Sequence, residues 1–175
     1  MKVYVDATTL IALERVGELE LLLNFDGHVL IPGSVADEIG DERAERNVEA
    51  LLDADSVSLA PETESGEYDR TARAVLGEDE TNGDVAIVAA VLRAVEQDES
   101  VAVLSDDRRV RTVAGGFDAA VTGTIGVVIR AVDEGMTPEA AKSLVRRLDS
   151  EGLHMTGELR ETADRLVEET AEERD

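Results

Sequence analysis

Short runs of apolar residues alternate with longer helical patterns along most of the chain. Val3 and Val5 lie in the first run, and residues 28–31 and 101–104 form two more, each with the length of a buried strand. The segment 84–97 instead gives a helix with an almost wholly apolar face, which indicates deep burial. Strands that alternate with helices predict an α/β fold, in which a central parallel sheet is flanked by helices on both faces.

Weaker patterns place the remaining elements. Leucines at helical spacing, from Leu10 to Leu23, predict a helix after the first strand. The charged stretch 41–75 is helical in pattern, and a short strand at Val57 and Leu59 is expected to interrupt it. Another strand is expected within 118–124, and further helices at about 108–116, 124–134, 137–150 and 156–172.

The length of the chain fits a single domain. A chain of 175 residues can enclose a full α/β core but is too short for two domains of typical size. Apolar residues make up 43% of it, with no Trp, so aliphatic side chains must build the core. We expect one domain over 1–175, with a core at about 1–135, C-terminal helices at about 136–172 and a solvated end to the last helix.

Composition excludes several classes of protein. No apolar run approaches the roughly 18 residues that a membrane span needs, and the N-terminus lacks a cleavable signal, so a cytoplasmic location without membrane contact is expected. The absence of cysteine excludes disulfides, thiolate catalysis and cysteine-bound zinc. His28 and His154 are the only histidines, and we expect a structural place for the first and a turn for the second. Any metal ion must therefore be held by oxygen.

The charge balance is strongly acidic. Lys and Arg together number 17 against 40 Asp and Glu, which gives a net charge of −23, and the apolar periodicity excludes a disordered acidic tail. This balance suggests a halophilic protein from a salt-rich cytoplasm, because in molar salt the Debye length falls to about 3 Å and self-repulsion is screened. The acidity therefore indicates a salt-rich environment rather than a kind of binding partner, and it does not exclude binding of nucleic acid.

Acidic side chains gather where the predicted strands end. In open parallel sheets the site lies outside the carboxyl ends of the strands. Four separate segments supply acids there: Asp6, Glu38, Glu80 with Asp84, and Asp106 with Asp107. Such a cluster would raise the pKa of its members and lower stability unless a cation neutralised it. Hard oxygen ligands of this kind suit Mg²⁺ or Mn²⁺.

Several of these acids also have a structural interpretation. Ser34 and Asp37 fit a capping pattern, so Asp37 is expected at a helix start and Glu38 remains as the ligand. Asp84 could merely complement a helix dipole, and Glu80 would repel it if both were helical. Ser105 could cap the next helix, with Asp106 and Asp107 in its first turn. The occurrence of acids in all four segments favours a metal site over these separate structural interpretations.

The four acidic segments, taken in order, resemble those of the PIN-domain nucleases, a family that includes the toxins of VapBC-type toxin–antitoxin systems. The resemblance covers residues 1 to about 165 and rests on the order and spacing of the segments rather than on any one of them. The segments are VDATTLIAL, IPGSVADEI, GEDETNGDVAIVAA and VLSDDRRVRTVA followed by VTGTIGVVIRA.

The resemblance implies a PIN-like three-layer sandwich, a Mg²⁺ or Mn²⁺ pocket and hydrolysis of single-stranded RNA, often by a homodimer. It assigns Asp6, Glu38 and Asp107 as catalytic and metal-binding acids. The third motif is ambiguous, because Asp84 stands three residues before an Ile whereas Glu78 or Glu80 fits one subgroup. Asp106 is an extra acid beside the fourth motif. If the chain is a toxin, an antitoxin protein is a further partner.

Other polar residues near these acids are candidates for supporting roles. With no histidine or lysine in place as a base, we favour the metal over a carboxylate for activating the attacking water. Thr8 and Ser105 could hydrogen-bond the carboxylates or a phosphate, or cap a turn. The best local candidates for the RNA backbone are Arg108, Arg109 and Arg111, which otherwise form a solvated helix face.

Other functions share this architecture. A haloacid-dehalogenase-like, Mg-dependent phosphohydrolase would need a second Asp two places after Asp6, where Thr8 stands. A receiver domain of phosphorelay signalling would need a lysine near the acids, and Lys2 and Lys142 are both badly placed. A non-catalytic PIN scaffold that binds RNA or protein is the remaining alternative, and acids at all four motifs argue against it.

Overall fold

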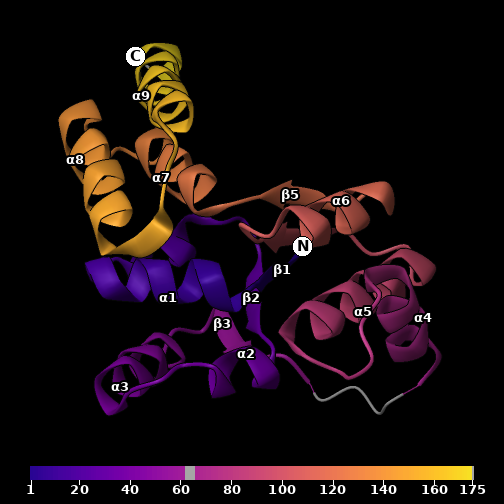
Figure 1. The fold of residues 1–175 in the computed structure, drawn as a ribbon. Coiled ribbons are helices and arrows are strands. Elements are labelled where there is room, and N and C mark those ends of the chain that lie inside the picture. Colours follow the sequence, from indigo (N-terminus) through magenta and orange to yellow (C-terminus); the bar gives the residue numbers. More distant parts are fainter. Residues whose placement is uncertain (62–65, 175) are drawn as a thin grey trace.

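The computed structural model describes residues 1–61 and 66–174 and contains a five-stranded parallel sheet (Figure 1). Across the sheet the strands are β3 (Val57–Leu59), β2 (His28–Ile31), β1 (Lys2–Val5), β4 (Val101–Leu104) and β5 (Ala120–Thr122). The chain winds outward from the central β1 to β3 and then crosses to β4 and β5 on the other side. The strand order therefore reverses between β1 and β4, and the crevice outside their carboxyl ends is where such sheets bind ligands.

Helices cover both faces of this sheet, which confirms the predicted α/β class. One face packs against α1 (Ala7–Val16), the 3₁₀ helix η1 (Leu19–Asn24), α3 (Glu42–Leu51) and α7 (Thr124–Asp133). The other packs against α5 (Gly83–Glu96) and α6 (Arg108–Gly116), and α4 (Glu67–Leu76) packs on α5. The short α2 (Gly33–Asp37) follows β2. The interruption expected within 41–75 is β3 and the segment after it, of which 62–65 lie outside the described residues.

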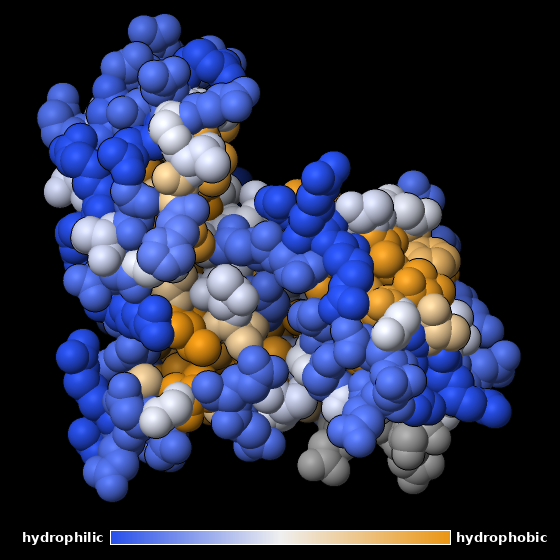
Figure 2. Space-filling view, in the orientation of Figure 1, coloured by the Kyte–Doolittle hydropathy of each residue, from blue (hydrophilic) through white to orange (hydrophobic). Residues whose placement is uncertain are grey.

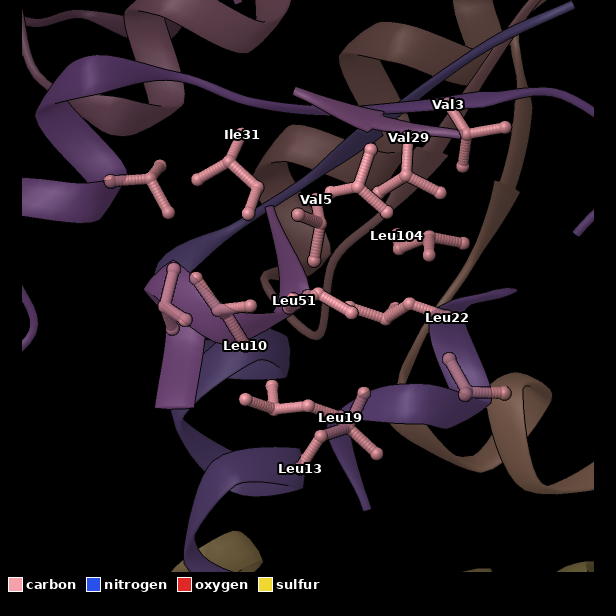
Figure 3. Close-up of a cluster of buried hydrophobic side chains, with 14 of the residues drawn as sticks. Val3, Val5, Leu10, Leu13, Leu19, Leu22, Val29, Ile31, Leu51 and Leu104 are labelled. Atoms are coloured by element: carbon pink, nitrogen blue, oxygen red, sulfur yellow. The ribbon is translucent and has the colours of Figure 1, made fainter. Parts of the chain in front are cut away.

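Side-chain alternation along the strands builds the two cores. Val3 and Val5 point to the α1 face, where Figure 3 shows them among Leu10, Leu22 and other aliphatic side chains. Tyr4, between them, points to the α5 face. Because both faces are buried, each central strand is apolar throughout, which is why the strands were recognisable from sequence.

The C-terminal helices α8 (Pro138–Leu148) and α9 (Gly157–Arg174) do not touch the sheet but pack on α7 and α1 (Figure 1). A turn of π-helical geometry, η2 (Asp149–Leu153), joins them. Buried Val167 and Ala171 tie α9 into this cluster, so the expected solvated end of the last helix is only partly correct. Hydrophilic residues dominate the outer surface of these helices (Figure 2).

Two local predictions were wrong. The leucine pattern from Leu10 to Leu23 is not one helix, because Gly17 adopts a left-handed conformation (φ 72°) that ends α1, and η1 begins afterwards. Ser34 and Asp37 do not cap a helix start: Pro32 occupies the N-cap of α2, and Asp37 is the last residue of this five-residue helix. None of the described helices is long and apolar enough to cross a membrane.

Candidate active site

Asp6 lies at the carboxyl end of the central strand and is only 3% exposed. As the N-cap of α1, it accepts a hydrogen bond from the backbone N–H of Thr9 at 2.7 Å. Its other carboxylate oxygen accepts a hydrogen bond from Ser105 Oγ at 2.5 Å. Ser105 reaches it because β1 and β4 pair in register, with Val5 opposite Leu104. The two strand ends that flank the reversal are thus joined through a carboxylate and a hydroxyl.

Ser105 also positions the fourth-motif acid. Its Oγ accepts a hydrogen bond from the backbone N–H of Asp107 at 3.1 Å. Asp107 in turn is the N-cap of α6 and accepts from the backbone N–H groups of Arg109 and Val110, at 2.7 and 3.0 Å. The alternative interpretation, in which Ser105 caps this helix, does not hold, since Asp107 is the cap. Ser105, fully buried, instead hydrogen-bonds the Asp6 carboxylate and the backbone N–H of Asp107.

The second and third motifs meet where α2 ends against the start of α5. Glu38 is the C-cap of α2, and Asn82 caps α5 through a 3.0 Å hydrogen bond from the backbone N–H of Val85. A Cβ on Gly83 would lie 2.9 Å from Val35 Cγ2 and 3.1 Å from Glu38 Oε1. The glycine therefore lets the Glu38 carboxylate lie beside the first turn of α5, which carries Asp84.

Burial and mutual repulsion raise the pKa values of these acids. Burial raises the pKa of Asp6 in spite of its hydrogen bonds from Ser105 and Thr9. Burial first, and then the negative charges of Asp84 and Asp6, raise the pKa of Glu38. For Asp84, burial and the charge of Asp107 raise the pKa, and Arg109 opposes them. The structure thus brings together one acid from each of the four motifs.

The geometry favours Asp84 as the acid of the third motif. Glu80 is exposed and precedes α5, so it does not share a helical face with Asp84. Glu78 lies 2.6 Å from Arg109 Nη2 in an ion pair. Asp84 is instead partly buried, and the negative charges of Asp107 and Asp6 contribute to its raised pKa.

A family model described as a PIN domain matches residues 2–169, which include all four acidic motifs and most of α9. The chain belongs to the PIN-domain family. No curated protein and no solved structure shows significant similarity to it. PIN domains are generally nucleases and typically use divalent metal ions, and the parallel sheet flanked by helices is consistent with their fold.

Asp106, the extra acid of this PIN domain, turns away from Asp107. It accepts hydrogen bonds from the backbone N–H of Thr124, at 2.9 Å, and from Thr124 Oγ1, and so anchors the start of α7. A Cβ on Gly123 would lie 2.2 Å from Asp106 Oδ1, so this anchor requires glycine. These contacts fix Asp106 to the start of α7, and its negative charge still contributes to the raised pKa of Asp6.

The three arginines of α6 differ in their partners. Arg109 donates to the carbonyl oxygen of Leu76 at 2.9 Å and pairs with Glu78 and, at 3.5 Å, with Asp84. Arg108 and Arg111 have no carboxylate partner within residues 1–61 and 66–174. Thr8, exposed in the first turn of α1, is also free of such contacts in that part of the chain. Arg108 and Arg111 therefore keep their charge available.

The donor set of the PIN domain fits a hard divalent cation. In the part of the chain that the structure describes, no three acidic or histidine side chains are grouped closely enough to form a complete cage as they stand. Mg²⁺ does not need one, because it commonly retains several waters and binds one or two carboxylates together with substrate phosphate. Ser105 links two acids of this donor set, through the Asp6 carboxylate and the backbone N–H of Asp107.

A second polar cluster, which sequence patterns hardly indicated, supports this site. Asp69, 6% exposed, accepts hydrogen bonds from Thr81 Oγ1 at 2.8 and 3.0 Å and lies 3.2 Å from Arg73 Nε. Arg73 also donates to the carbonyl oxygen of Asp79 at 3.0 Å. These contacts fix the loop before α5 to α4. The only signal was the spacing of Asp69 and Arg73, four residues apart on a predicted helix.

Proposed function

We propose that this PIN domain is a Mg²⁺- or Mn²⁺-dependent endoribonuclease that hydrolyses phosphodiester bonds in single-stranded RNA. The observation that carries the proposal is the convergence of Asp6, Glu38, Asp84 and Asp107 outside the strand reversal, where burial and like charges raise the pKa values of three of them. Such a cluster would favour the binding of a divalent cation, for which a substrate phosphate is a common further ligand.

Asp6 and Asp107 would hold the metal, with Glu38 and Asp84 binding directly or through water. When bound, the metal supplies an acidified water and stabilises the charge that grows on a phosphate oxygen during in-line attack. Ser105 would hold the Asp6 carboxylate through one hydrogen bond and the backbone of Asp107 through the other, while the N–H groups of Arg109 and Val110 hold the Asp107 carboxylate. Glu38, more exposed than Asp6, is placed to accept a hydrogen bond from water that enters the cluster.

Charge near the acids supports binding of a polyanion. Arg108 and Arg111 have no carboxylate partner among the described residues and are the candidates for the RNA backbone. Arg109 is held by Glu78 and Asp84, so its part in the proposal is to orient Asp84. Repulsion between RNA and a chain of net charge −23 is weak in molar salt, where screening acts within about 3 Å.

A toxin role is a narrower form of the same proposal. It would add an antitoxin protein as partner and a homodimer as the active assembly. Expression of the chain alone should then arrest growth. Co-expression of an antitoxin protein, if a small gene beside this one encodes it, should restore growth.

The decisive experiment compares Asp107→Asn with Asp106→Asn in cleavage of single-stranded RNAs, in molar KCl with Mn²⁺ or EDTA. We expect the native protein and Asp106→Asn to cut RNA only with the metal, and Asp107→Asn to lose about 10²-fold or more of the rate while remaining folded. If folded native protein cuts no RNA yet is stabilised by Mn²⁺, the nuclease proposal fails and a phosphohydrolase or scaffold must be considered.

A further inference from the structure

A cleft runs along the exposed side of α1, away from the acidic cluster. Its first part, of about 210 Å³, is lined by Thr8, Ile11 and Arg15 of α1, by Glu38, and by Glu151 and Leu153 of the turn η2. A second part, of about 290 Å³, shares Ile11, Arg15 and Glu38 with the first. The turn η2 lies beside α1 at the base of α8 (Figure 1). The turn η2 thus supplies one wall of a cleft that begins at Glu38.

Arg15 occupies this cleft with most of its hydrogen-bonding capacity unused. Its Nη1 donates to the carbonyl oxygen of Glu151 at 3.2 Å, and the side chain has no other partner among the described residues. A guanidinium has five N–H donors, so several remain available. Gly152 (φ 115°) leaves room for it, because a Cβ there would lie 3.1 Å from Arg15 Nη1.

Several arginines of this acidic chain are paired with carboxylates. Arg130 lies 2.8 Å from Asp26, and Arg147 lies 3.0 Å from Glu18. Arg15 instead donates its printed hydrogen bond to a backbone carbonyl, although four acids line the two parts of the cleft: Glu14, Glu38, Asp41 and Glu151. The turn holds the guanidinium without neutralising it, which is the arrangement that an anion-binding site requires.

We propose that Arg15 binds a backbone phosphate of the RNA substrate and that the α1 cleft carries the strand away from the acidic cluster. This inference rests on the proposed nuclease function. Thr8 and Arg15 are seven residues apart, which is roughly 10 Å along a helix, so Arg15 contacts a phosphate other than the one that is cleaved. It is a positioning residue, and its loss raises KM and leaves kcat nearly unchanged.

Two variants separate this role from a structural one. Arg15→Gln keeps a donor for the Glu151 carbonyl and removes the charge, whereas Arg15→Ala removes both. Arg146→Ala is the matched control, because Arg146 is an exposed arginine of α8 with no carboxylate partner in the described part of the chain, and it does not line the cleft.

The readouts are cleavage of a labelled single-stranded RNA with Mn²⁺ and binding of the same RNA in EDTA over a range of KCl concentrations. Both Arg15 variants should raise KM and weaken binding roughly five- to tenfold, with kcat within twofold and Arg146→Ala unchanged. The slope of log affinity against log salt should fall by about 0.7, the value for one lost phosphate contact on a single strand.

The possible results separate failure of the Arg15 inference from failure of the proposed nuclease function. If the native protein cleaves RNA and Arg15→Gln matches Arg146→Ala in KM and salt slope, Arg15 does not bind the substrate and the nuclease proposal stands. A loss confined to Arg15→Ala, with Arg15→Gln normal, assigns Arg15 to the turn and also overturns the inference. If the native protein binds but cuts no RNA, the nuclease proposal fails, and weaker binding by Arg15→Gln still supports the cleft as an RNA site.

Discussion

Asp6 and Asp69 are both buried, with exposures of 3% and 6%, but their surroundings differ. Asp69 has a cation, Arg73, at 3.2 Å and a hydroxyl donor from Thr81. Asp6 has only neutral donors, and the nearby charges that affect it come from other acids. Burial of a carboxylate therefore does not mark a functional site in this protein. What distinguishes Asp6 is that the described part of the chain provides it with no cation.

The largest difference in the free energy of unfolding should appear when the carboxylates of Asp69 and Asp6 are removed one at a time. Asp69→Ala leaves Thr81 without its acceptor and Arg73 without its carboxylate, and we expect the free energy of unfolding to fall by about 2–3 kcal/mol, with the exposed part of Arg73 limiting the loss. Asp6→Asn keeps an acceptor for the N-cap and removes a repelling charge, so its stability should equal or exceed that of the native protein. Denaturant unfolding in molar KCl measures both.

Asp69→Asn is the control, because its amide oxygen can still accept from Thr81 and the loss should be smaller. The contrast between the two acids disappears if Asp6→Asn is destabilised as much as Asp69→Ala. It is sharpened if Asp6→Asn is stable but no longer gains stability from Mn²⁺.

A smaller loss of stability is expected when the Glu38 carboxylate is displaced but not removed. Gly83→Ala would place a methyl group 2.9 Å from Val35 Cγ2 and 3.1 Å from Glu38 Oε1. We expect a net loss of about 1–2 kcal/mol from overpacking and a weaker stabilisation by Mn²⁺, because Glu38 must shift. Gly33→Ala, where nothing lies within 4 Å, should be neutral. Equal behaviour of the two variants in a thermal shift with Mn²⁺ would show that the position of Glu38 is unimportant.

The smallest effect is a dependence of stability on pH. The pKa values of Asp6, Glu38 and Asp84 are raised in the folded protein, so the folded state binds more protons than the unfolded state. Their contribution should therefore favour folding at low pH and be lost as pH rises through the raised pKa values. Without metal, the stability advantage of Asp6→Asn over the native protein should grow with pH across that range. An advantage that shrinks as pH rises would contradict the pKa direction of Asp6.

The sequence predicted the strands and the acids at their ends because both follow from local patterns. Central strands buried on two faces are continuous apolar runs, and the strand-end rule then places Asp6 and Asp107 near the same crevice. The roles of neighbours were not predictable in this way. Whether Asp106 or Asp107 faces the cluster depends on the dihedral angles of one turn. The bridging role of Ser105 depends on the register of β1 with β4, two strands nearly a hundred residues apart.

Other contacts escaped prediction because they join distant segments. Arg109 meets Glu78 and Asp84 only after α6 packs near the start of α5, so spacing alone could not separate it from Arg108 and Arg111. Arg15 gave no signal at all, because an arginine in the last turn of a helix is common. Its place was set by the turn η2, more than a hundred residues later.

The sheet ends on both sides in its shortest strands, since β3 and β5 have three residues each. An unpaired strand edge is a template on which another chain can add. In dilute solution the large net charge would keep copies apart, but molar salt screens that repulsion. Under such conditions the brevity of the edge strands, rather than the acidity of the surface, is what limits edge-to-edge aggregation of this protein.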